Sequence, residues 1–276
     1  MRLSDGLHWN LVGMYGSVLT GLREALRENP GIASIGVDSW AVDYGLIIRS
    51  RLLGEPFHYR DERTAAGVDA VHARHPHAEL FSRNGLQFLP FNTLYQFAAE
   101  DRELLGAADH ALLIPDLIGY WLTGQARTER TNASTTGLLR ADTGEWDAEL
   151  LASLGIPARM LAPLIAPGET LGELSADVAA ALGVTTRTAV TAVGSHDTAS
   201  AVVAVPMTSP DAAYISCGTW DSSASRPRGR CSPMPPARRS SRTRAASTVA
   251  CASSATSWGC GSSARPSADG SAKATR

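Results

Sequence analysis

Cysteine is scarce in this chain, and the few copies exclude two kinds of site. Four cysteines occur in 276 residues, and all but Cys217 lie beyond position 230. Their spacing matches neither the paired motif of a zinc site nor a disulfide framework. We therefore assign no metal ligand and no disulfide.

Long apolar runs are also missing near the start of the chain. In MRLSDGLHWNLVGMYG, polar residues interrupt every apolar run, which excludes a signal peptide or a membrane anchor in this segment. With 44% hydrophobic residues, 19% charged residues and a formal net charge of −2, the composition is that of a globular protein. We expect a cytoplasmic protein that binds neither a membrane nor nucleic acid.

Lysine is absent from residues 1–220, which hold fifteen arginines and twenty-five acidic residues. From Asp221 onward, nine arginines and one lysine accompany only two acidic residues, and Leu, Ile, Phe and Tyr do not occur. Such a segment cannot bury enough apolar surface to offset the entropy of ordering its backbone. The sequence therefore predicts a folded domain over 1–218 and a disordered Ser-, Arg-, Ala- and Pro-rich tail over 219–276.

Apolar periodicity predicts that helices and strands alternate in the folded part. Residues 9–26 carry apolar side chains at helical spacing, and this pattern stops at Asn29-Pro30-Gly31. Two buried strands follow, IASIGVDSW and VDYGLII. Further helices are predicted over 62–75, 91–106 and 109–122, and in WDAELLASLG and SADVAAALG, each ended by glycine. RTAVTAVGSHDTASAVV reads as strand, turn and helix, and AAYISCGTW as a last strand, which together indicate an α/β domain.

The most informative segment is the turn that follows the predicted strand ending at Gly194. Asp197 lies at the carboxyl end of that strand, where open α/β sheets bind their ligands. Alternatively, Ser195, Asp197 or Thr198 caps the next helix by accepting its first amides. The local pattern leaves both interpretations open.

Seven collinear segments resemble the FGGY family of carbohydrate kinases. They extend over about 200 residues in the family's order, and a series of this kind is far more specific than any single motif. GLQFLPFNTLYQ in particular is similar to the members that phosphorylate L-rhamnulose. The other six are IGVDSWAVDYGL, YRDERT, IPDLIGYWLTG, ERTNASTTGLL, SHDTASA and AAYISCGTW.

The resemblance implies a ribonuclease H-like, actin-like ATPase fold, here the first domain of a sugar kinase without its opening hairpin. It implies transfer of the γ-phosphoryl group of ATP, with Mg²⁺, to the 1-hydroxyl of L-rhamnulose. Asp197 is then the catalytic base that accepts the proton of the attacking hydroxyl, a role that phosphoryl transfer requires of a carboxylate. His196 and Thr198, on either side of it, are implied to contact the sugar.

Two further pairs carry implied roles. Trp40 and Ala41 match a sugar-contacting Trp-Gly step, although Ala41 departs from the usual glycine and its methyl group narrows the approach of the backbone to a ligand. Gly218 and Thr219 match a turn that meets the phosphates of ATP, where small residues expose backbone amides to an anion. The alternative for this second pair is a plain turn at the end of a strand.

The YRDERT loop leaves two interpretations open. Arg60, Asp61 and Arg63 either line the sugar pocket or form a solvated loop of salt bridges. For Arg63 we favour the salt-bridge loop, and for Arg60 and Asp61 the sequence does not decide.

The two ends of the chain depart from the family pattern. The family's Asp-x-Gly phosphate loop precedes the residues matched here, and a second domain follows Gly-Thr-Trp. Possible codons for Asp221–Ser225 and for 255–261 read, at one shared frame offset, as the family's continuation. We interpret 219–276 as out-of-frame sequence after a frameshift near codon 221; the alternative is a natural basic tail that binds nucleic acid or an acidic partner.

Two alternatives to L-rhamnulose phosphorylation follow from these departures. One is a family member that acts on another ketose or on a polyol, which the Ala41 substitution keeps open. The other is a chain without catalytic turnover. We expect such a fragment to have low stability, because an unpaired strand edge exposes backbone groups and apolar surface.

Overall fold

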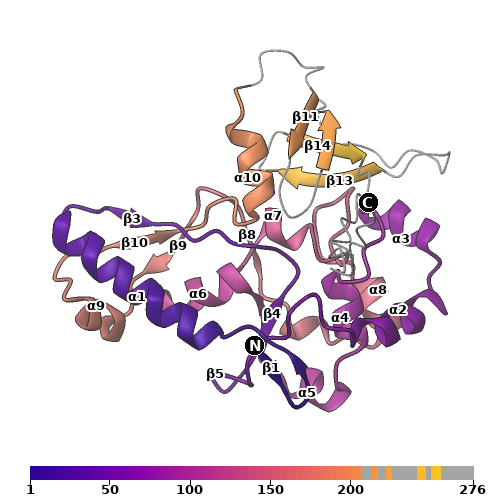
Figure 1. The fold of residues 1–276 in the computed structure, drawn as a ribbon, viewed down its shortest axis with the longest axis horizontal. Coiled ribbons are helices and arrows are strands. Elements are labelled where there is room, and N and C mark those ends of the chain that lie inside the picture. Colours follow the sequence, from indigo (N-terminus) through magenta and orange to yellow (C-terminus); the bar gives the residue numbers. More distant parts are fainter. Residues whose placement is uncertain (207–212, 217–221, 226–240, 247–249, 256–276) are drawn as a thin grey trace, which may run out of the picture.

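The computed structural model describes residues 1–206 and four later segments, 213–216, 222–225, 241–246 and 250–255 (Figure 1). Ten α-helices lie in the described part: α1 Leu11–Glu28, α2 Thr64–His72, α3 His77–Asn84, α4 Thr93–Ala98, α5 Arg102–Ala107, α6 Ile114–Thr123, α7 Arg130–Ala133, α8 Ala148–Leu154, α9 Ala176–Leu182 and α10 Asp197–Ala204. A 3₁₀ turn covers Ala158–Met160.

The described strands are short and form five sheets. Their bounds are β1 Arg2–Leu3, β2 Gly6–Leu7, β3 Ser34–Ile35, β4 Tyr44–Ile48, β5 Arg51–Leu52, β6 His110–Leu113, β7 Thr128–Glu129, β8 Leu164–Ile165, β9 Thr170–Glu173, β10 Ala189–Thr191, β11 Ala213–Ser216, β12 Ser222–Ser225, β13 Ser241–Ala246 and β14 Ala250–Ala255. The sheet orders are β1-β2, β3-β10-β9, β5-β4-β6, β7-β8 and β11-β12-β14-β13.

The β5-β4-β6 sheet separates two hydrophobic cores. β4 and β6 pair antiparallel, with Tyr44 opposite Leu113 and Gly45 opposite Leu112. Because side chains alternate between the faces of a strand, Tyr44 and Leu113 contribute to one core, whereas Leu112 and Ile47 contribute to the other. The first core also contains residues of α2, α3, α4, α5 and α8, and the second contains residues of α1, α6, β3 and β10.

Helix α1 confirms the predicted opening helix. The Asn10 side chain accepts a hydrogen bond from the Gly13 amide at 3.0 Å, so the helix begins with a side-chain cap. Leu11 and Leu26 are buried, and the helix packs near α9 along the β3-β10-β9 sheet (Figure 1). A two-stranded hairpin, β1 and β2, precedes it.

The predicted helix over 109–122 is wrong in its first turn. Residues His110–Leu113 form strand β6, and α6 begins only at Ile114. HALLI is an apolar run that fits a buried strand and a buried helix equally well. Pairing with β4, more than 60 residues earlier in the chain, favours the strand here.

Glycine ends four of the described helices in the left-handed conformation, including Gly85 after α3 with φ 67°. Gly155 after α8 has φ 65° and Gly183 after α9 has φ 73°, as the two glycine-ended patterns predict. Gly124 ends α6 in the same way, with φ 74°. The predicted helix ends at Gly124, Gly155 and Gly183 are confirmed.

Strand β11 lies within the predicted last strand, AAYISCGTW, and pairs antiparallel with β12. Strands β12, β13 and β14 lie within the predicted tail, 219–276, and they join β11 by backbone pairing alone as far as the structure describes them. The disorder of the tail is predicted because the segment can bury little apolar surface, and the burial of these side chains is not described. The disorder and the boundary at 218 therefore remain predictions. The rest of the tail lies outside the described residues.

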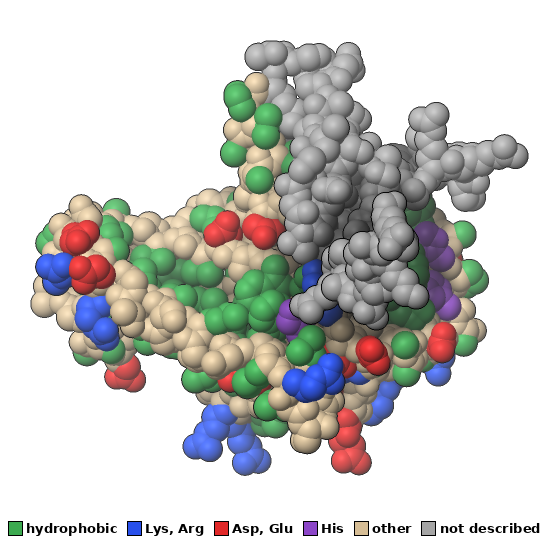
Figure 2. Space-filling view, viewed as in Figure 1, with side chains coloured by type: hydrophobic (Ala, Val, Ile, Leu, Met, Phe, Trp, Pro, Cys, Tyr) green, Lys and Arg blue, Asp and Glu red, His purple; other side chains and the backbone are tan. Residues whose placement is uncertain are grey.

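Apolar side chains reach the surface of the described part at several places (Figure 2). Figure 2 shows helix α10 projecting from the body with apolar side chains on it; Val203 of this helix and Val205 just after it are exposed. Within residues 1–206, no helix is long and apolar enough to span a bilayer.

We expect Gly67→Ala to destabilise the fold, because a Cβ at Gly67 in α2 would lie 2.0 Å from the Tyr95 carbonyl oxygen of α4. The two helix backbones would have to separate, and such overpacking costs about 1–3 kcal/mol. Gly21→Ala is the matched control, since nothing lies within 4 Å of its Cβ position in α1. That change should stabilise by roughly 0.5–1 kcal/mol. Equal unfolding free energies of the two variants in urea would contradict this account of the α2–α4 contact.

Candidate active site

Two loops that contain the predicted site residues meet beyond β3 and β10. These strands run parallel, with Ala189 beside Ser34. The pairing resumes further along, where Ser39 bridges His196, and the Asp197 amide donates to the Ser39 carbonyl oxygen at 3.1 Å. The structure thus brings Trp40 and Asp197 to the carboxyl ends of neighbouring parallel strands, the place where open α/β sheets bind ligands.

Asp197 is exposed, whereas Trp40 on the other loop is half-buried. Asp197 is the first residue of α10, and its Oδ1 accepts hydrogen bonds from the Thr198 amide at 2.5 Å and from the Thr198 hydroxyl at 3.2 Å. His196 Nε2 lies 3.8 Å from the same oxygen, and the His196 side chain is buried. The carboxylate is therefore accessible to a ligand and is oriented by both of its neighbours.

The alternative that this turn only caps α10 is wrong for two of its three residues. The Ser195 amide and hydroxyl both donate to Glu129 Oε2 at 3.0 Å. The Thr198 hydroxyl donates to Asp197 and accepts no amide of the first turn. The cap residue of α10 is His196, whose side chain makes no capping bond. Only Asp197 supports a first-turn amide, that of Thr198.

A buried carboxylate, Asp43, fixes the orientation of Trp40. Its Oδ2 accepts the indole N–H of Trp40 at 3.0 Å, the indole N–H of Trp9 at 2.6 Å and the Tyr59 amide at 3.2 Å. Its Oδ1 accepts a bond from Gln96 Nε2 at 3.1 Å, and Asp43 is fully buried. Four donors from four separate segments therefore converge on one carboxylate.

Burial raises the pKa of Asp43 to about 6 from the ordinary value of 3.8, while the four donors lower it. At neutral pH the side chain is thus mostly ionised. Below pH 6 it takes up a proton and loses an acceptor position, which weakens the bonds that orient Trp9 and Trp40.

Backbone strain accompanies Asp43. The residue before it, Val42, has φ 72°, a left-handed value that is rare for a β-branched residue. Its carbonyl oxygen accepts hydrogen bonds from Thr93 Oγ1 at 2.7 Å and from Gln96 Nε2 at 3.1 Å. Strain of this kind persists only where surrounding bonds enforce it, and it is concentrated at functional sites.

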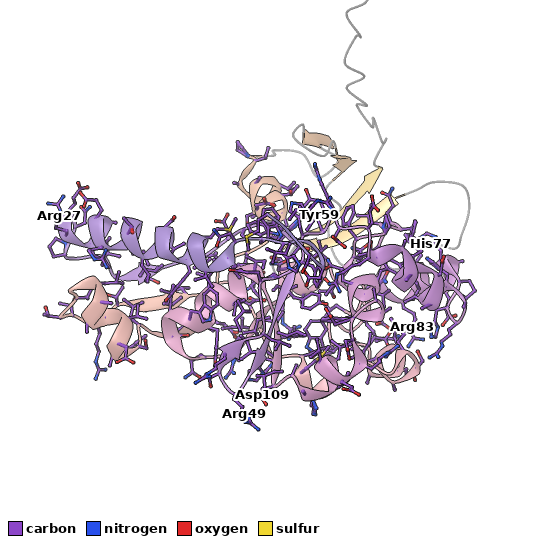
Figure 3. All side chains as sticks on the ribbon, turned by 60° about the horizontal axis from the view of Figure 1, so that its bottom comes forward. Arg27, Arg49, Tyr59, His77, Arg83 and Asp109 are labelled. Carbon is purple, nitrogen blue, oxygen red and sulfur yellow. The ribbon has the colours of Figure 1, made fainter. Side chains whose placement is uncertain are left out.

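Aromatic rings extend from Trp40 across the base of the site. Trp9 packs on Trp40 with ring centroids 4.3 Å apart and stacks on His58 at 4.0 Å. His58 in turn contacts Tyr59 at 4.6 Å. Figure 3 shows Tyr59 on the α10 side of the molecule, well away from Arg49 and Asp109 at the opposite edge. Ala41 is half-buried at the Trp40 end of this row.

The YRDERT loop is held by bonds to the body of the protein. Arg63 forms an ion pair with Glu100 at 3.0 Å, as predicted, but both side chains are mostly buried, so the prediction of a solvated loop is wrong. Asp61 accepts hydrogen bonds from the Leu7 amide at 2.7 Å and from the Arg63 amide at 2.9 Å. Arg60 is exposed, with its guanidinium 5.5 Å from the Tyr59 ring centroid. This loop thus secures the β1–β2 hairpin.

The residues predicted to bind ATP and Mg²⁺ are only partly covered by the described part of the chain. Gly218 and Thr219, the predicted ATP contacts, lie outside the described residues. In the described part of the chain, no three His, Cys, Asp or Glu side chains gather as a metal site. Magnesium in phosphoryl-transfer sites is held by one or two carboxylates together with substrate phosphates. A cluster of three protein ligands is therefore not required for Mg²⁺ in such a site.

Sequence reasoning missed two buried carboxylates that support the site, Asp43 and Glu129, and the amide of Gln96. All three lie inside the segments IGVDSWAVDYGL, ERTNASTTGLL and GLQFLPFNTLYQ. That location was the only available signal, because nothing in the residue type distinguishes a buried carboxylate from one in solvent.

Comparison with known proteins gives concordant matches. A model of the N-terminal domain of the FGGY family of carbohydrate kinases matches residues 16–204. The chain is 40% identical over 227 residues to a rhamnulokinase of Enterococcus faecalis, a match that covers 79% of this chain and 46% of that protein. It is 44% identical over 218 residues to a rhamnulokinase of Pectobacterium atrosepticum, covering 77% and 42%. The chain thus spans less than half the length of these relatives.

Solved structures confirm the predicted fold, an actin-like first domain of a sugar kinase. A ligand-bound xylulose kinase from Lactobacillus acidophilus superposes with a TM-score of 0.79 at 19% identity, covering 92% of this chain and 52% of that one. Plasmodium falciparum glycerol kinase with ADP gives a TM-score of 0.77 at 14% identity, covering 93% and 54%. At these identities the likeness establishes the fold alone.

We expect the near-ultraviolet circular dichroism of the tryptophans to change with a midpoint near pH 6, because protonation of Asp43 loosens Trp9 and Trp40. Asp43→Asn should abolish this transition. Since the folded-state pKa is raised, Asp43 contributes stability below pH 4 that is lost as the pH rises through 6.

Asp109→Asn is the control for this titration. Asp109 is exposed and accepts the Arg49 amide at 2.6 Å, remote from the tryptophans (Figure 3). The control should keep the transition near pH 6. A transition that survives in Asp43→Asn would show that another group is responsible.

Proposed function

Because this chain belongs to the FGGY family of carbohydrate kinases, we propose that it carries the sugar site of a kinase that phosphorylates L-rhamnulose. The reaction transfers the γ-phosphoryl group of ATP to the 1-hydroxyl and gives L-rhamnulose 1-phosphate. The observation that carries the proposal is the meeting of Trp40 and Asp197 across the Ser39–His196 bridge. The names of the relatives support L-rhamnulose as the sugar.

In this proposal Asp197 is the catalytic base. Its exposed carboxylate is free to receive a substrate hydroxyl, and it accepts the proton of that hydroxyl as the oxygen attacks phosphorus. His196 and Thr198 flank the carboxylate and contact the sugar, while Trp40 and Ala41 form the opposing wall. ATP binds with Mg²⁺, and Gly218 and Thr219 meet its phosphates. The partners are therefore the sugar and ATP, in the cytoplasm.

Two other functions remain candidates. A kinase of another ketose or of a polyol is favoured by one observation, the alanine at position 41 in place of the family's glycine. A sugar-binding chain without turnover is the other. Incubation of the purified chain with ATP and, in turn, L-rhamnulose, L-fuculose, D-xylulose and glycerol separates these. Phosphorylation of L-rhamnulose supports the proposed kinase, phosphorylation of another compound supports the first alternative, and binding without phosphorylation supports the second.

We expect Asp197→Asn to lower turnover of L-rhamnulose by roughly 10²–10⁴ with little change in KM, because it removes the base and keeps the shape of the side chain. The measurement is steady-state phosphorylation by a kinase of full family length that contains residues 1–218. Asp177→Asn is the matched control, since Asp177 is an exposed carboxylate in the first turn of α9, as Asp197 is in α10. Turnover of Asp197→Asn within about tenfold of the parent would refute the assignment of the base.

We expect Ala41→Gly to tighten L-rhamnulose binding roughly fivefold, equivalent to about 1 kcal/mol, by removing a methyl group from the wall beside Trp40. Isothermal titration calorimetry on the 276-residue chain, with L-rhamnulose, L-fuculose, D-xylulose and glycerol, provides the comparison. A preference of the parent chain for one of the other three compounds would reject L-rhamnulose as the substrate.

A further inference from the structure

A second buried carboxylate, Glu129, lies behind the Asp197 loop. It is the last residue of β7, it precedes α7 as its cap, and only 2% of its surface is exposed. It makes no contact with the proposed substrate wall of Trp40 and Ala41 among the interactions described above. Its bonds connect two segments that are far apart in sequence.

One set of bonds caps helix α7. Glu129 Oε1 accepts the Thr131 amide at 2.8 Å, and Oε2 accepts the Thr131 hydroxyl at 2.5 Å and the Asn132 amide at 3.1 Å. These are the bonds expected of an acidic cap, because they satisfy amides that the first helical turn leaves free.

The other set reaches 66 residues along the chain to Ser195. Both the amide and the hydroxyl of Ser195 donate to Glu129 Oε2, each at 3.0 Å. On its other side, the Ser195 carbonyl oxygen accepts the Ser39 amide at 3.0 Å. Ser195 is thereby fixed from two directions, two residues before Asp197.

We propose that Glu129 is a positioning residue for Asp197, because it holds Ser195 and thereby sets where α10 begins. The bonds are charge-assisted, and such bonds are shorter and stronger than those between neutral groups. The proposal adds a residue to the proposed kinase site, and its sugar-binding test rests on that proposed function. Its hydrogen-exchange test does not rest on the proposed function.

Asp116 of α6 holds the backbone of Glu129 in place. Asp116 Oδ1 accepts the Glu129 amide at 3.1 Å, and Asp116 is itself buried, with its Oδ2 lacking a hydrogen-bond partner within the described residues. Burial raises the pKa of Asp116 well above its ordinary value, and the nearby Glu129 raises it further. The raised pKa favours the neutral form of Asp116, which adds no second negative charge beside Glu129.

Glu129 differs from an acidic residue that only caps a helix. Asp101 caps α5 by accepting the Glu103 amide at 2.7 Å and the Leu104 amide at 3.4 Å. In the part of the chain that the structure describes, the acceptor bonds of its side chain stay within its own helix. Asp101→Asn, which changes a cap carboxylate to an amide and leaves the link between Glu129 and Ser195 intact, is therefore the matched control.

Glu129→Gln tests the proposal, because the amide group places a donor where the Ser195, Thr131 and Asn132 donors converge. The measurement is amide hydrogen exchange of the 276-residue chain, resolved at Ser195 to Thr198. We expect exchange there to accelerate by roughly tenfold in Glu129→Gln, the size expected when one such bond is lost. Asp101→Asn should leave exchange at Ser195 to Thr198 unchanged, because Asn still caps a helix and α5 has no described bond to Ser195.

The pattern of exchange distinguishes a positioning residue from a helix cap. Faster exchange at Thr131 and Asn132 with no change at Ser195 to Thr198 would reduce Glu129 to a helix cap and overturn the proposal. If Glu129→Gln fails to fold, Ser195→Ala replaces it, since this variant keeps the cap of α7 and removes one bond to Glu129. Ser195→Ala should then accelerate amide exchange at Asp197 and Thr198 but not in α7. Exchange rates at Asp197 and Thr198 equal to those of the parent, or an equal acceleration in α7, would overturn the proposal.

L-Rhamnulose binding by calorimetry gives the functional readout. Glu129→Gln should weaken it by roughly tenfold, and Asp101→Asn should leave it unchanged. If the parent chain binds no L-rhamnulose while Glu129→Gln still accelerates exchange at Ser195, the proposed function fails and the positioning role stands. If the parent binds and both variants bind equally well, the positioning role fails and the proposed function stands.

Discussion

The buried carboxylate of Asp43 is the interaction on which the rest of the site depends. Its donors come from the segment before α1, from the loop after β3, from the YRDERT loop and from α4. Each segment by itself is short, and none could fix the indole of Trp40 alone. Because an ionised carboxylate without partners is costly in the interior, the four donors must arrive together, and the arrangement of these segments follows from that requirement.

Glu129 is a second buried carboxylate that accepts several donors, and it lies on the other side of the site. Asp43 orients Trp40 on the loop after β3, and Glu129 holds Ser195 on the loop after β10. The two loops meet where Ser39 bridges His196. Buried charge at two fixed points therefore aligns the ends of two parallel strands, which are only two and three residues long and would give little rigidity by themselves.

Local sequence determined much of the fold but little of this support. The glycine-ended helices α8 and α9 and the turn from β10 into α10 follow from short-range chemistry, and they were predictable. The strand β6 was not, because its pairing with β4 depends on residues far away in the chain. The same holds for the site: the carboxyl end of β10 pointed to Asp197, and only the family resemblance pointed to Trp40. The donors to Asp43 and Glu129 lie up to 66 residues from them, beyond any local pattern.

The contrast between buried and exposed carboxylates explains how one site combines rigidity with reactivity. Asp43 and Glu129 are enclosed, so their bonds form in a low-dielectric interior, where electrostatic attraction is strong. Asp197 is open to water, which hydrates it and weakens its attraction for a substrate hydroxyl. A bound sugar would displace that water and bring Asp197 into surroundings like those of its two supports. If Asp197 is the base as proposed, it acquires its full strength only when substrate covers it, whereas its position is set beforehand.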